Sequence, residues 1–286
     1  MQTLEVYDHV MVYRDLLPDV ERLYEICRHL ESKSHEGFIY QGWRDWYTFG
    51  RMCDCSSQAV PLIFDLDNTI QEAEKQNKKD ELLLEIELFV SLQTANEKAI
   101  KEYVAEKEMV IPERNYIATP NLAYYTPGTD IDGGGHAMNF HTDYNIGEWW
   151  WPGQKFLLTC TTYVNDDYEG GEIVFYNKGS LYTFKPRAGD ILVFPSGDPK
   201  YPGNDPYFHA VNTPLGKGKF LVRSYLKYWN PQNALLWHLL KKQYGEKTWT
   251  EMTENFARHK NMLNWEQVSN NSYQENLSDL VRQLYA

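Results

Sequence analysis

Cysteine is scarce in this chain, and it is not arranged for a disulfide framework or a zinc site. Only 4 cysteines occur in 286 residues. Cys53 and Cys55 are separated by one residue, whereas the cysteines of redox pairs and zinc knuckles are separated by two. The chain also lacks an apolar N-terminal signal segment and any long apolar run. These absences predict a cytoplasmic protein with no membrane partner.

Positively charged residues are also few. The 28 Lys and Arg residues are outnumbered by 40 Asp and Glu residues, which gives a net charge of −12 at pH 7. A protein that grips the phosphate backbone of a nucleic acid needs a basic patch or groove. We therefore expect no nucleic-acid partner.

Aromatic residues, by contrast, are abundant, at 15% of the chain with 21 Tyr and 9 Trp. β-Sheets favour such residues, and we expect some of them to line a pocket or a partner surface. An apolar content of 42% over 286 residues is enough for the core of one large domain. No repeat or Pro/Gly linker divides the chain, so residues 1–286 are expected to form a single domain.

Three zones are expected within this domain. Residues 1–118 read as a mixed N-terminal support region, with helical periodicity near Asp19–Leu30 and over Asp80–Lys107. Residues 119–228 hold short β-branched and aromatic runs broken by Gly, Pro, Asn and Asp, which predicts about eight strands. Helical patterns return over 229–286. The expected fold class is α+β, with a double-stranded β-helix (jelly-roll) core and flanking N-terminal and C-terminal helices.

A His-x-Asp pair, His141 and Asp143, lies in the β-rich zone, and His209 follows downstream. Residues two apart share a face on a strand but lie on nearly opposite sides of a helix. His29 and Glu31 have the same spacing, but they fall in a helical pattern and cannot bind one metal ion. Together, His141, Asp143 and His209 make up the ligand set of a facial-triad iron(II) site, which leaves three adjacent coordination positions open.

Two further features near the pair are candidates for the pocket mouth. His136 follows three glycines and comes five residues before His141, so it is a rival ligand or, more in keeping with a flexible loop, part of the entrance. Trp149, Trp150 and Trp151 are consecutive. Because side chains alternate along an extended chain, all three cannot face one core. At least one is expected at the pocket mouth, in a lid or at an interface.

Six motifs succeed one another in the second zone. They are Tyr125-Thr126-Pro127-Gly128, His141-Thr142-Asp143, Tyr163-Val164-Asn165, Gly170-Gly171 with Phe175, Pro186 with Gly189-Asp190 and Phe194, and His209 with Lys219 ten residues later. In this order they resemble the catalytic core of the Fe(II)/2-oxoglutarate-dependent dioxygenases, and within them the prolyl 4-hydroxylase-like group. The resemblance covers roughly 100 residues.

The resemblance implies a metal cofactor and a cosubstrate. His141, Asp143 and His209 would hold Fe(II), and 2-oxoglutarate and O2 would take the open positions. Halogenating relatives carry a small residue in place of the carboxylate, so the presence of Asp143 favours hydroxylation of an unactivated C–H bond. Desaturation or ring closure stays open, because substrate placement decides between them. Whether ascorbate is needed as a reductant also stays open.

The far carboxylate of 2-oxoglutarate needs a buried cation and a hydroxyl donor. Lys219 has the group's ten-residue spacing from His209, and Tyr163 can supply the hydroxyl. Arg223, four residues further along the same strand face, is the alternative anchor, since Arg binds carboxylates in bidentate fashion. It would otherwise bind a substrate carboxylate or a buried acid. Tyr125 either donates to the cosubstrate near the metal or simply packs.

By the same resemblance, the substrate would be a prolyl residue in a peptide, free proline or a related amino acid, with 2-oxoglutarate and O2 converted to succinate and CO2. Two other hypotheses stay open. A non-catalytic jelly-roll (cupin-like) ligand-binding module would not need three ligands together with Lys219 and Tyr163. A cupin-type metal enzyme would bring more histidine ligands than this chain offers. The oligomeric state is not predicted.

Overall fold

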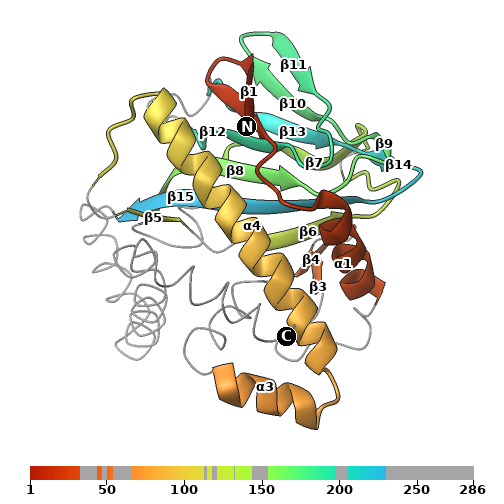
Figure 1. The fold of residues 1–286 in the computed structure, drawn as a ribbon. Helices are drawn as coiled ribbons and strands as arrows, with labels where there is room; N and C mark the ends of the chain where they lie inside the picture. The colour runs from red at the N-terminus through yellow and green to blue at the C-terminus, as the bar shows by residue number, and fades with distance from the viewer. Residues whose placement is uncertain are drawn as a thin grey trace, which may run out of the picture.

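The structure, a computed structural model, describes residues 1–32, 44–46, 50–53, 66–112, 115–117, 121–131, 133–143, 154–197 and 205–229. Two antiparallel sheets form the centre of the molecule, and a long helix crosses the larger one (Figure 1). The helices expected over 229–286 and the tryptophans at 149–151 lie outside the described residues.

The larger sheet has the strand order β1-β2-β12-β8-β15-β6-β4-β3, and β5 also pairs with β15. Its strands are β1 (Gln2–Tyr7), β2 (Val10–Arg14), β3 (Arg44–Trp46), β4 (Gly50–Cys53), β5 (Asn115–Ile117), β6 (Asn121–Tyr125), β8 (Gln154–Tyr163), β12 (Ile191–Pro195) and β15 (Lys219–Trp229). The N-terminal zone therefore does more than support the core, because it adds strands at both ends of this sheet.

The smaller sheet has the order β11-β10-β13-β7. Its strands are β7 (His136–His141), β10 (Ile173–Asn177), β11 (Ser180–Phe184) and β13 (His209–Asn212), and a short pair consists of β9 (Glu169–Gly170) and β14 (Pro214–Leu215). Two facing antiparallel sheets make a double-stranded β-helix, so the predicted α+β fold class with a jelly-roll core is confirmed for the described residues.

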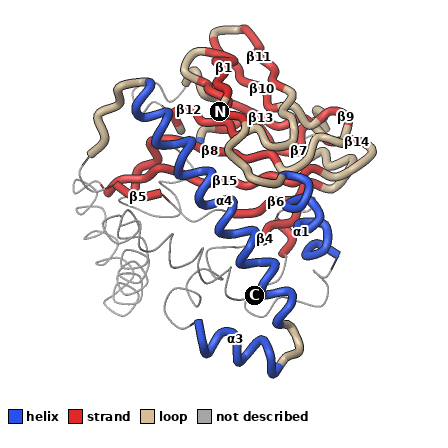
Figure 2. Tube along the Cα trace, viewed as in Figure 1, coloured by secondary structure: helices blue, strands red, loops and turns tan. Residues whose placement is uncertain are grey.

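The helices that the structure describes with both ends lie before residue 107, and Figure 2 shows them in blue. They are α1 (Val20–Ser32), α3 (Leu66–Lys75) and α4 (Lys79–Glu106). The two helices predicted from periodicity match α1 and α4 to within two residues. α4 packs against β8, β12 and β15, and α1 packs against α4. One face of the larger sheet is therefore covered by helices, which leaves its other face for the smaller sheet.

Alternation along the strands divides the core into two layers. On β12, Ile191 and Val193 pack with the helices, while Leu192 and Phe194 pack between the sheets. Successive side chains on a strand point to opposite faces, so a continuous apolar run of this kind indicates a strand buried on both sides. The layer between the sheets also contains Tyr163, which lies beside the site described below.

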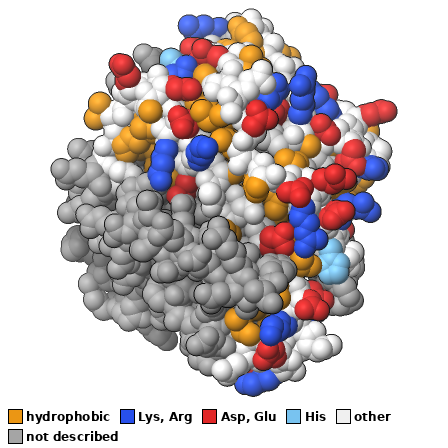
Figure 3. All heavy atoms as spheres, in the orientation of Figure 1, with side chains coloured by type: hydrophobic (Ala, Val, Ile, Leu, Met, Phe, Trp, Pro, Cys, Tyr) orange, Lys and Arg blue, Asp and Glu red, His pale blue; other side chains and the backbone are white. Residues whose placement is uncertain are grey.

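The helix-covered side of the molecule carries mixed charge. In the view of Figure 3, acidic and basic side chains alternate over the described helices and strands. None of the described helices is long and apolar enough to cross a membrane. The apolar residues of α4 that pack in the core beside the sheet include Leu92, Ala99 and Tyr103.

Candidate metal centre

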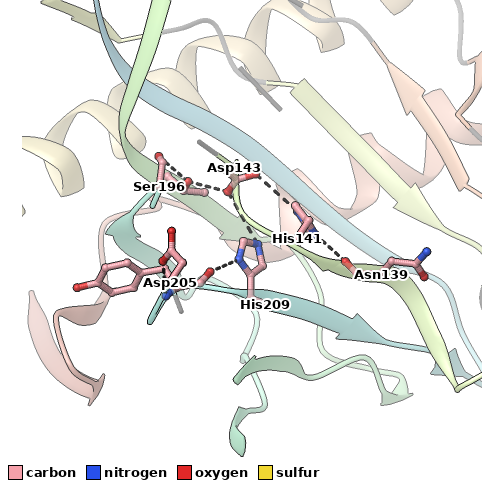
Figure 4. Close-up of polar contacts among 8 residues, drawn as sticks. Asn139, His141, Asp143, Ser196, Asp205 and His209 are labelled. Atoms are coloured by element: carbon pink, nitrogen blue, oxygen red, sulfur yellow. Dashed lines mark hydrogen bonds and ion pairs between the residues drawn. The ribbon is translucent and has the colours of Figure 1, made fainter. Parts of the chain in front are cut away.

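Three side chains, two from strands of the smaller sheet and one just beyond the end of β7, converge on one point (Figure 4). His141 is the last residue of β7, Asp143 follows two residues later, and His209 is the first residue of β13. The Nε2 atom of His141 lies 3.6 Å from Oδ1 of Asp143, and the Nε2 atom of His209 lies 3.8 Å from Oδ2. All three ligand atoms lie within 4.8 Å of one another, which is close enough for one metal ion to contact them.

Strand pairing explains why two histidines that are distant in sequence meet. β7 and β13 are antiparallel neighbours, and His209 lies opposite His141. Each imidazole is oriented by a carbonyl oxygen two residues earlier in the chain. Nδ1 of His141 lies 2.7 Å from the Asn139 oxygen, and Nδ1 of His209 lies 2.8 Å from the Tyr207 oxygen. A carbonyl can only accept, so Nδ1 must donate, and the Nε2 lone pair is left for the metal.

Asp143 is 2% exposed and reaches the cluster as a carboxylate. Burial alone would raise the pKa of this carboxyl, but its contacts with His141, His209 and Thr159 outweigh burial and hold the pKa below its usual range. Burial and the proximity of His141 lower the pKa of His209 to about 4. One anionic carboxylate and a neutral imidazole are the protonation states that a divalent ion requires of its ligands.

The Asp143 carboxylate is held by a chain of hydroxyl groups. Thr159 Oγ1 donates a hydrogen bond of 2.7 Å to Oδ2 of Asp143. The Ser196 hydroxyl lies 2.9 Å from Thr159 Oγ1, and Ser196 is 0% exposed. Because the Thr159 proton is engaged by the carboxylate, Ser196 acts as the donor to Thr159. This chain fixes the orientation of the carboxylate before any metal binds.

A cavity opens beside the three ligands. Its wall consists of Tyr125, Met138, His141, Asp143, Thr159, Thr161, Tyr163, Ile173, His209, Val211, Leu221 and Arg223. Three sequence candidates beyond the triad, Tyr125, Tyr163 and Arg223, are therefore in the wall. His136 is not in this wall. It begins β7 opposite Asn212, and its ring packs edge-to-face on Phe140 with centroids 5.3 Å apart.

Lys219 lies close to the cavity wall and is 0% exposed. Its Nζ atom donates to the Gly171 carbonyl oxygen at 2.6 Å and lies 4.8 Å from the centre of the Tyr163 ring. Burial, with the charge of Lys185 as the second cause, lowers the pKa of Lys219 to about 7. An ammonium has three donors, and the structure gives one of them a hydrogen-bond partner among the described residues.

Several wall residues were not among the sequence candidates, notably Thr159 and Thr161. The sequence does contain a signal that these two threonines face the pocket. Both alternate with Tyr163 along β8, and residues two apart share a face. Identifying Tyr163 as a pocket residue therefore places the two threonines on the pocket side as well. Trp149, Trp150 and Trp151, predicted at the pocket mouth, lie outside the described residues.

The donor set suits the implied cofactor. Two imidazole nitrogens and one carboxylate on one side of a cavity are the ligands of facial-triad iron(II) sites. The buried ammonium of Lys219 beside Tyr163 suits a ligand that carries a carboxylate. The residues present thus fit both Fe(II) and a dicarboxylate cosubstrate.

Comparison with known proteins gives a family for this region. Residues 122–230 match the model of the 2OG-Fe(II) oxygenase superfamily. No curated protein matches the chain in sequence.

Solved structures provide distant similarities. A collagen prolyl hydroxylase of Paramecium bursaria Chlorella virus-1, in a 2OG complex, is 13% identical with a TM-score of 0.42, over 78% of this chain and 97% of that one. A prolyl-4-hydroxylase of Pseudomonas putida is 13% identical with a TM-score of 0.40, over 78% and 94%. A Trichoplax adhaerens prolyl hydroxylase, in complex with a hypoxia inducible factor peptide fragment, is 12% identical with a TM-score of 0.41, over 80% and 86%. Values this low carry no information on substrate.

The matched region contains all three candidate ligands, the cavity wall and Lys219. Residues 122–230, which match the 2OG-Fe(II) oxygenase superfamily model, are therefore the part of the chain that builds the candidate metal site.

Proposed function

We propose that this protein hydroxylates an unactivated C–H bond of a proline-like amino acid or a prolyl residue, and converts 2-oxoglutarate and O2 to succinate and CO2. The observation that carries the proposal is the convergence of His141, Asp143 and His209 on one cavity that has a buried lysine beside it. When bound, Fe(II) and 2-oxoglutarate supply the oxidising chemistry. The residues of the chain bind the metal, orient the cosubstrate and shield the reacting centre from water.

The first task of the chain is to present three ligands in a fixed geometry. His141 and His209 are locked in the tautomer that offers Nε2, because their Nδ1 atoms donate to backbone carbonyls. Asp143 supplies one negative charge, which offsets part of the charge of a divalent ion. All three ligands come from one side, so the opposite side stays available to other molecules.

The second task is to orient the cosubstrate. We assign Lys219 as the cation for its far carboxylate and Tyr163 as the hydroxyl donor. The support is that Lys219 is buried, has one hydrogen-bond partner among the described residues, the Gly171 oxygen, and lies against the Tyr163 ring. A carboxylate with its several lone pairs would accept the remaining donors. Arg223, also in the wall, remains the alternative anchor.

The third task is to keep water from the reacting centre. Met138, Ile173, Val211 and Leu221 form an apolar part of the wall. An apolar wall lowers the local dielectric and strengthens the polar contacts that hold the cosubstrate. It also suits the hydrocarbon part of a proline-like substrate, which is consistent with the proposed substrate class.

The test is succinate release by the full chain supplied with Fe(II), 2-oxoglutarate and O2. It would be run with proline peptides, free amino acids and small metabolites, each with and without ascorbate, while mass spectrometry follows the addition of one oxygen atom. Asp143→Ala should abolish product. Asp167→Asn is a matched control, because Asp167 also pairs with a cation but lies on the surface.

An anaerobic titration separates this proposal from a binding module. Chelation of Fe(II) by 2-oxoglutarate should produce a weak visible band at about 500–530 nm. A chain that takes up no iron and shows no such band is not an oxygenase, and the ligand-binding module would then be favoured. Oxygen uptake that is equal with and without 2-oxoglutarate would instead favour a cupin-type enzyme.

A further inference from the structure

A second lysine, the half-buried Lys227, lies on the same strand face as the pocket residues. Leu221 and Arg223 of β15 are in the cavity wall, and alternate residues of a strand share a face. Tyr225 and Lys227 therefore continue the pocket face beyond Arg223. The Lys227 ammonium lies 5.6 Å from the centre of the Tyr225 ring, which agrees with this placement.

The surroundings of Lys227 are built by an irregularity in the neighbouring strand. Leu226 pairs with Leu158, but the next residue, Lys227, pairs with Phe156, so β8 has one extra residue at this point. Leu158 packs under the helices, whereas the Phe156 ring lies 4.5 Å from the Tyr225 ring. In a regular strand, residues 156 and 158 would share a face. The bulge turns Phe156 to the pocket face, which is a recurrent use of bulges near functional sites.

The Phe156–Tyr225 ring pair is what holds the Lys227 ammonium. Its Nζ atom lies 4.3 Å from the centre of the Phe156 ring. Burial lowers the pKa of Lys227 to about 8, and no charged group contributes to this shift. Among the described residues, no carboxylate forms an ion pair with it. Two aromatic faces compensate only part of the cost of half-burying an ammonium, so the site is suited to receive an anion.

Register places Lys227 relative to the metal ligands. Tyr225 lies opposite Thr159, which donates to Asp143, so the triad is level with Tyr225 along the strand. Lys227 is one step of about 7 Å beyond this level, and Lys219 lies on the other side of it. A cosubstrate anchored at Lys219 would therefore approach the metal from one side. A ligand held by Lys227 would approach from the other.

We propose that Lys227 and the Phe156–Tyr225 ring pair form a carboxylate-binding subsite for the primary substrate. The substrate is then a small acid with a free carboxylate, such as a free amino acid, rather than a residue inside a peptide. The ring pair would pack against the hydrocarbon part of that acid. This inference rests on the proposed function, because it takes the cosubstrate to lie on the Lys219 side.

The test compares free amino acids with their primary amides, for example L-proline with L-prolinamide, which differ in the carboxylate alone. The protein is the full chain loaded with Mn(II) and 2-oxoglutarate, and the readouts are the shift in melting temperature and the dissociation constant. We expect at least one free acid to bind and its amide to bind about 10- to 100-fold more weakly, as for the loss of a charge-assisted hydrogen bond. Succinate release with Fe(II) should rise with the same acid.

Variants separate a binding role from a structural one. Lys227→Gln should remove the preference for acid over amide and leave binding of Mn(II) and 2-oxoglutarate unchanged, while Lys227→Arg should retain part of it. Lys217→Gln is the control, because Lys217 is an exposed lysine in the turn that precedes β15. It should behave as the unmodified protein.

Three results would overturn the proposal: equal binding of acids and amides, an acid preference that survives in Lys227→Gln, or no binding of any free acid. The failure of the proposed function would look different. In that case Mn(II) and 2-oxoglutarate would not bind, while titration of the acids into the metal-free chain would still show whether Lys227 receives a carboxylate.

Discussion

Thr159→Val is the substitution that most directly tests how the candidate metal site is organised. Valine keeps the branched shape of threonine and removes its hydroxyl. In the structure that hydroxyl donates to Asp143 over 2.7 Å and lies 2.9 Å from the Ser196 hydroxyl. All three side chains are buried, so water does not readily replace the lost group.

The expected magnitude follows from the charge of the acceptor. A hydrogen bond to a charged group contributes about 1.5–3 kcal/mol, and each 1.4 kcal/mol is about a tenfold change in an equilibrium constant. Without the Thr159 hydroxyl, the Asp143 carboxylate loses its fixed orientation. We therefore expect affinity for a divalent metal to fall about 10- to 100-fold, as for other losses of a group that orients a ligand. Ser196 also loses an acceptor, which should destabilise the fold by about 1–3 kcal/mol.

The assay is calorimetric titration of Mn(II) or Co(II) into the metal-free chain, with thermal unfolding to verify the fold. Thr161→Val is the matched control, because Thr161 is two residues away on the same face of β8, also in the cavity wall, and makes no hydrogen bond with Asp143. Metal affinity of Thr159→Val within twofold of the unmodified chain would refute the reasoning. An equal loss in Thr161→Val would do the same.

Three further outcomes follow from the site. Binding of 2-oxoglutarate needs the Lys219 ammonium, and the pKa of this group is lowered to about 7, so the dissociation constant should rise with pH above 7, by about tenfold per unit. Lys219→Arg should flatten that dependence in a pH series of titrations. Steady-state assays should give Lys219→Ala a much larger KM for 2-oxoglutarate than Arg223→Ala, and the reverse order would transfer the anchor role to Arg223. Gly171→Ala should lower the melting temperature, because Gly171 has φ +68° and a Cβ there would lie 2.6 Å from the Tyr168 ring; an unchanged melting temperature would contradict this.

The local parts of the structure could be predicted from the sequence because local patterns determine them. Helical periodicity gave α1 and α4 almost to their ends. The i, i+2 spacing of His141 and Asp143 indicated one strand face, although Asp143 in fact lies just beyond the end of β7. Local rules do not specify which strands pair. That His209 lies opposite His141 was accessible only through the order of motifs in the resemblance.

Long-range contacts account for what the sequence did not reveal. β2 pairs with β12, and Arg14 forms an ion pair of 2.7 Å with Asp190, 176 residues later in the chain. Nothing in the periodicity of residues 1–118 indicates that partner, so the N-terminal zone read as a support and not as part of the larger sheet. The same holds for the Gly171 carbonyl that accepts from Lys219, since a backbone oxygen leaves no trace in composition.

The register of β15 ties the fold to the chemistry. Lys219, Arg223 and Lys227 recur every fourth residue, so they share one face at steps of about 13 Å. β15 is held between β6 and β8, with Lys219 opposite Tyr125 and Arg223 opposite Thr161. A slip of one residue would turn all three cations toward the helices and would bring Phe220 and Val222 into the cavity. In a chain of net charge −12, these three cations concentrate positive charge where two acids would meet. The strand pairing is therefore a requirement of ligand binding as much as of stability.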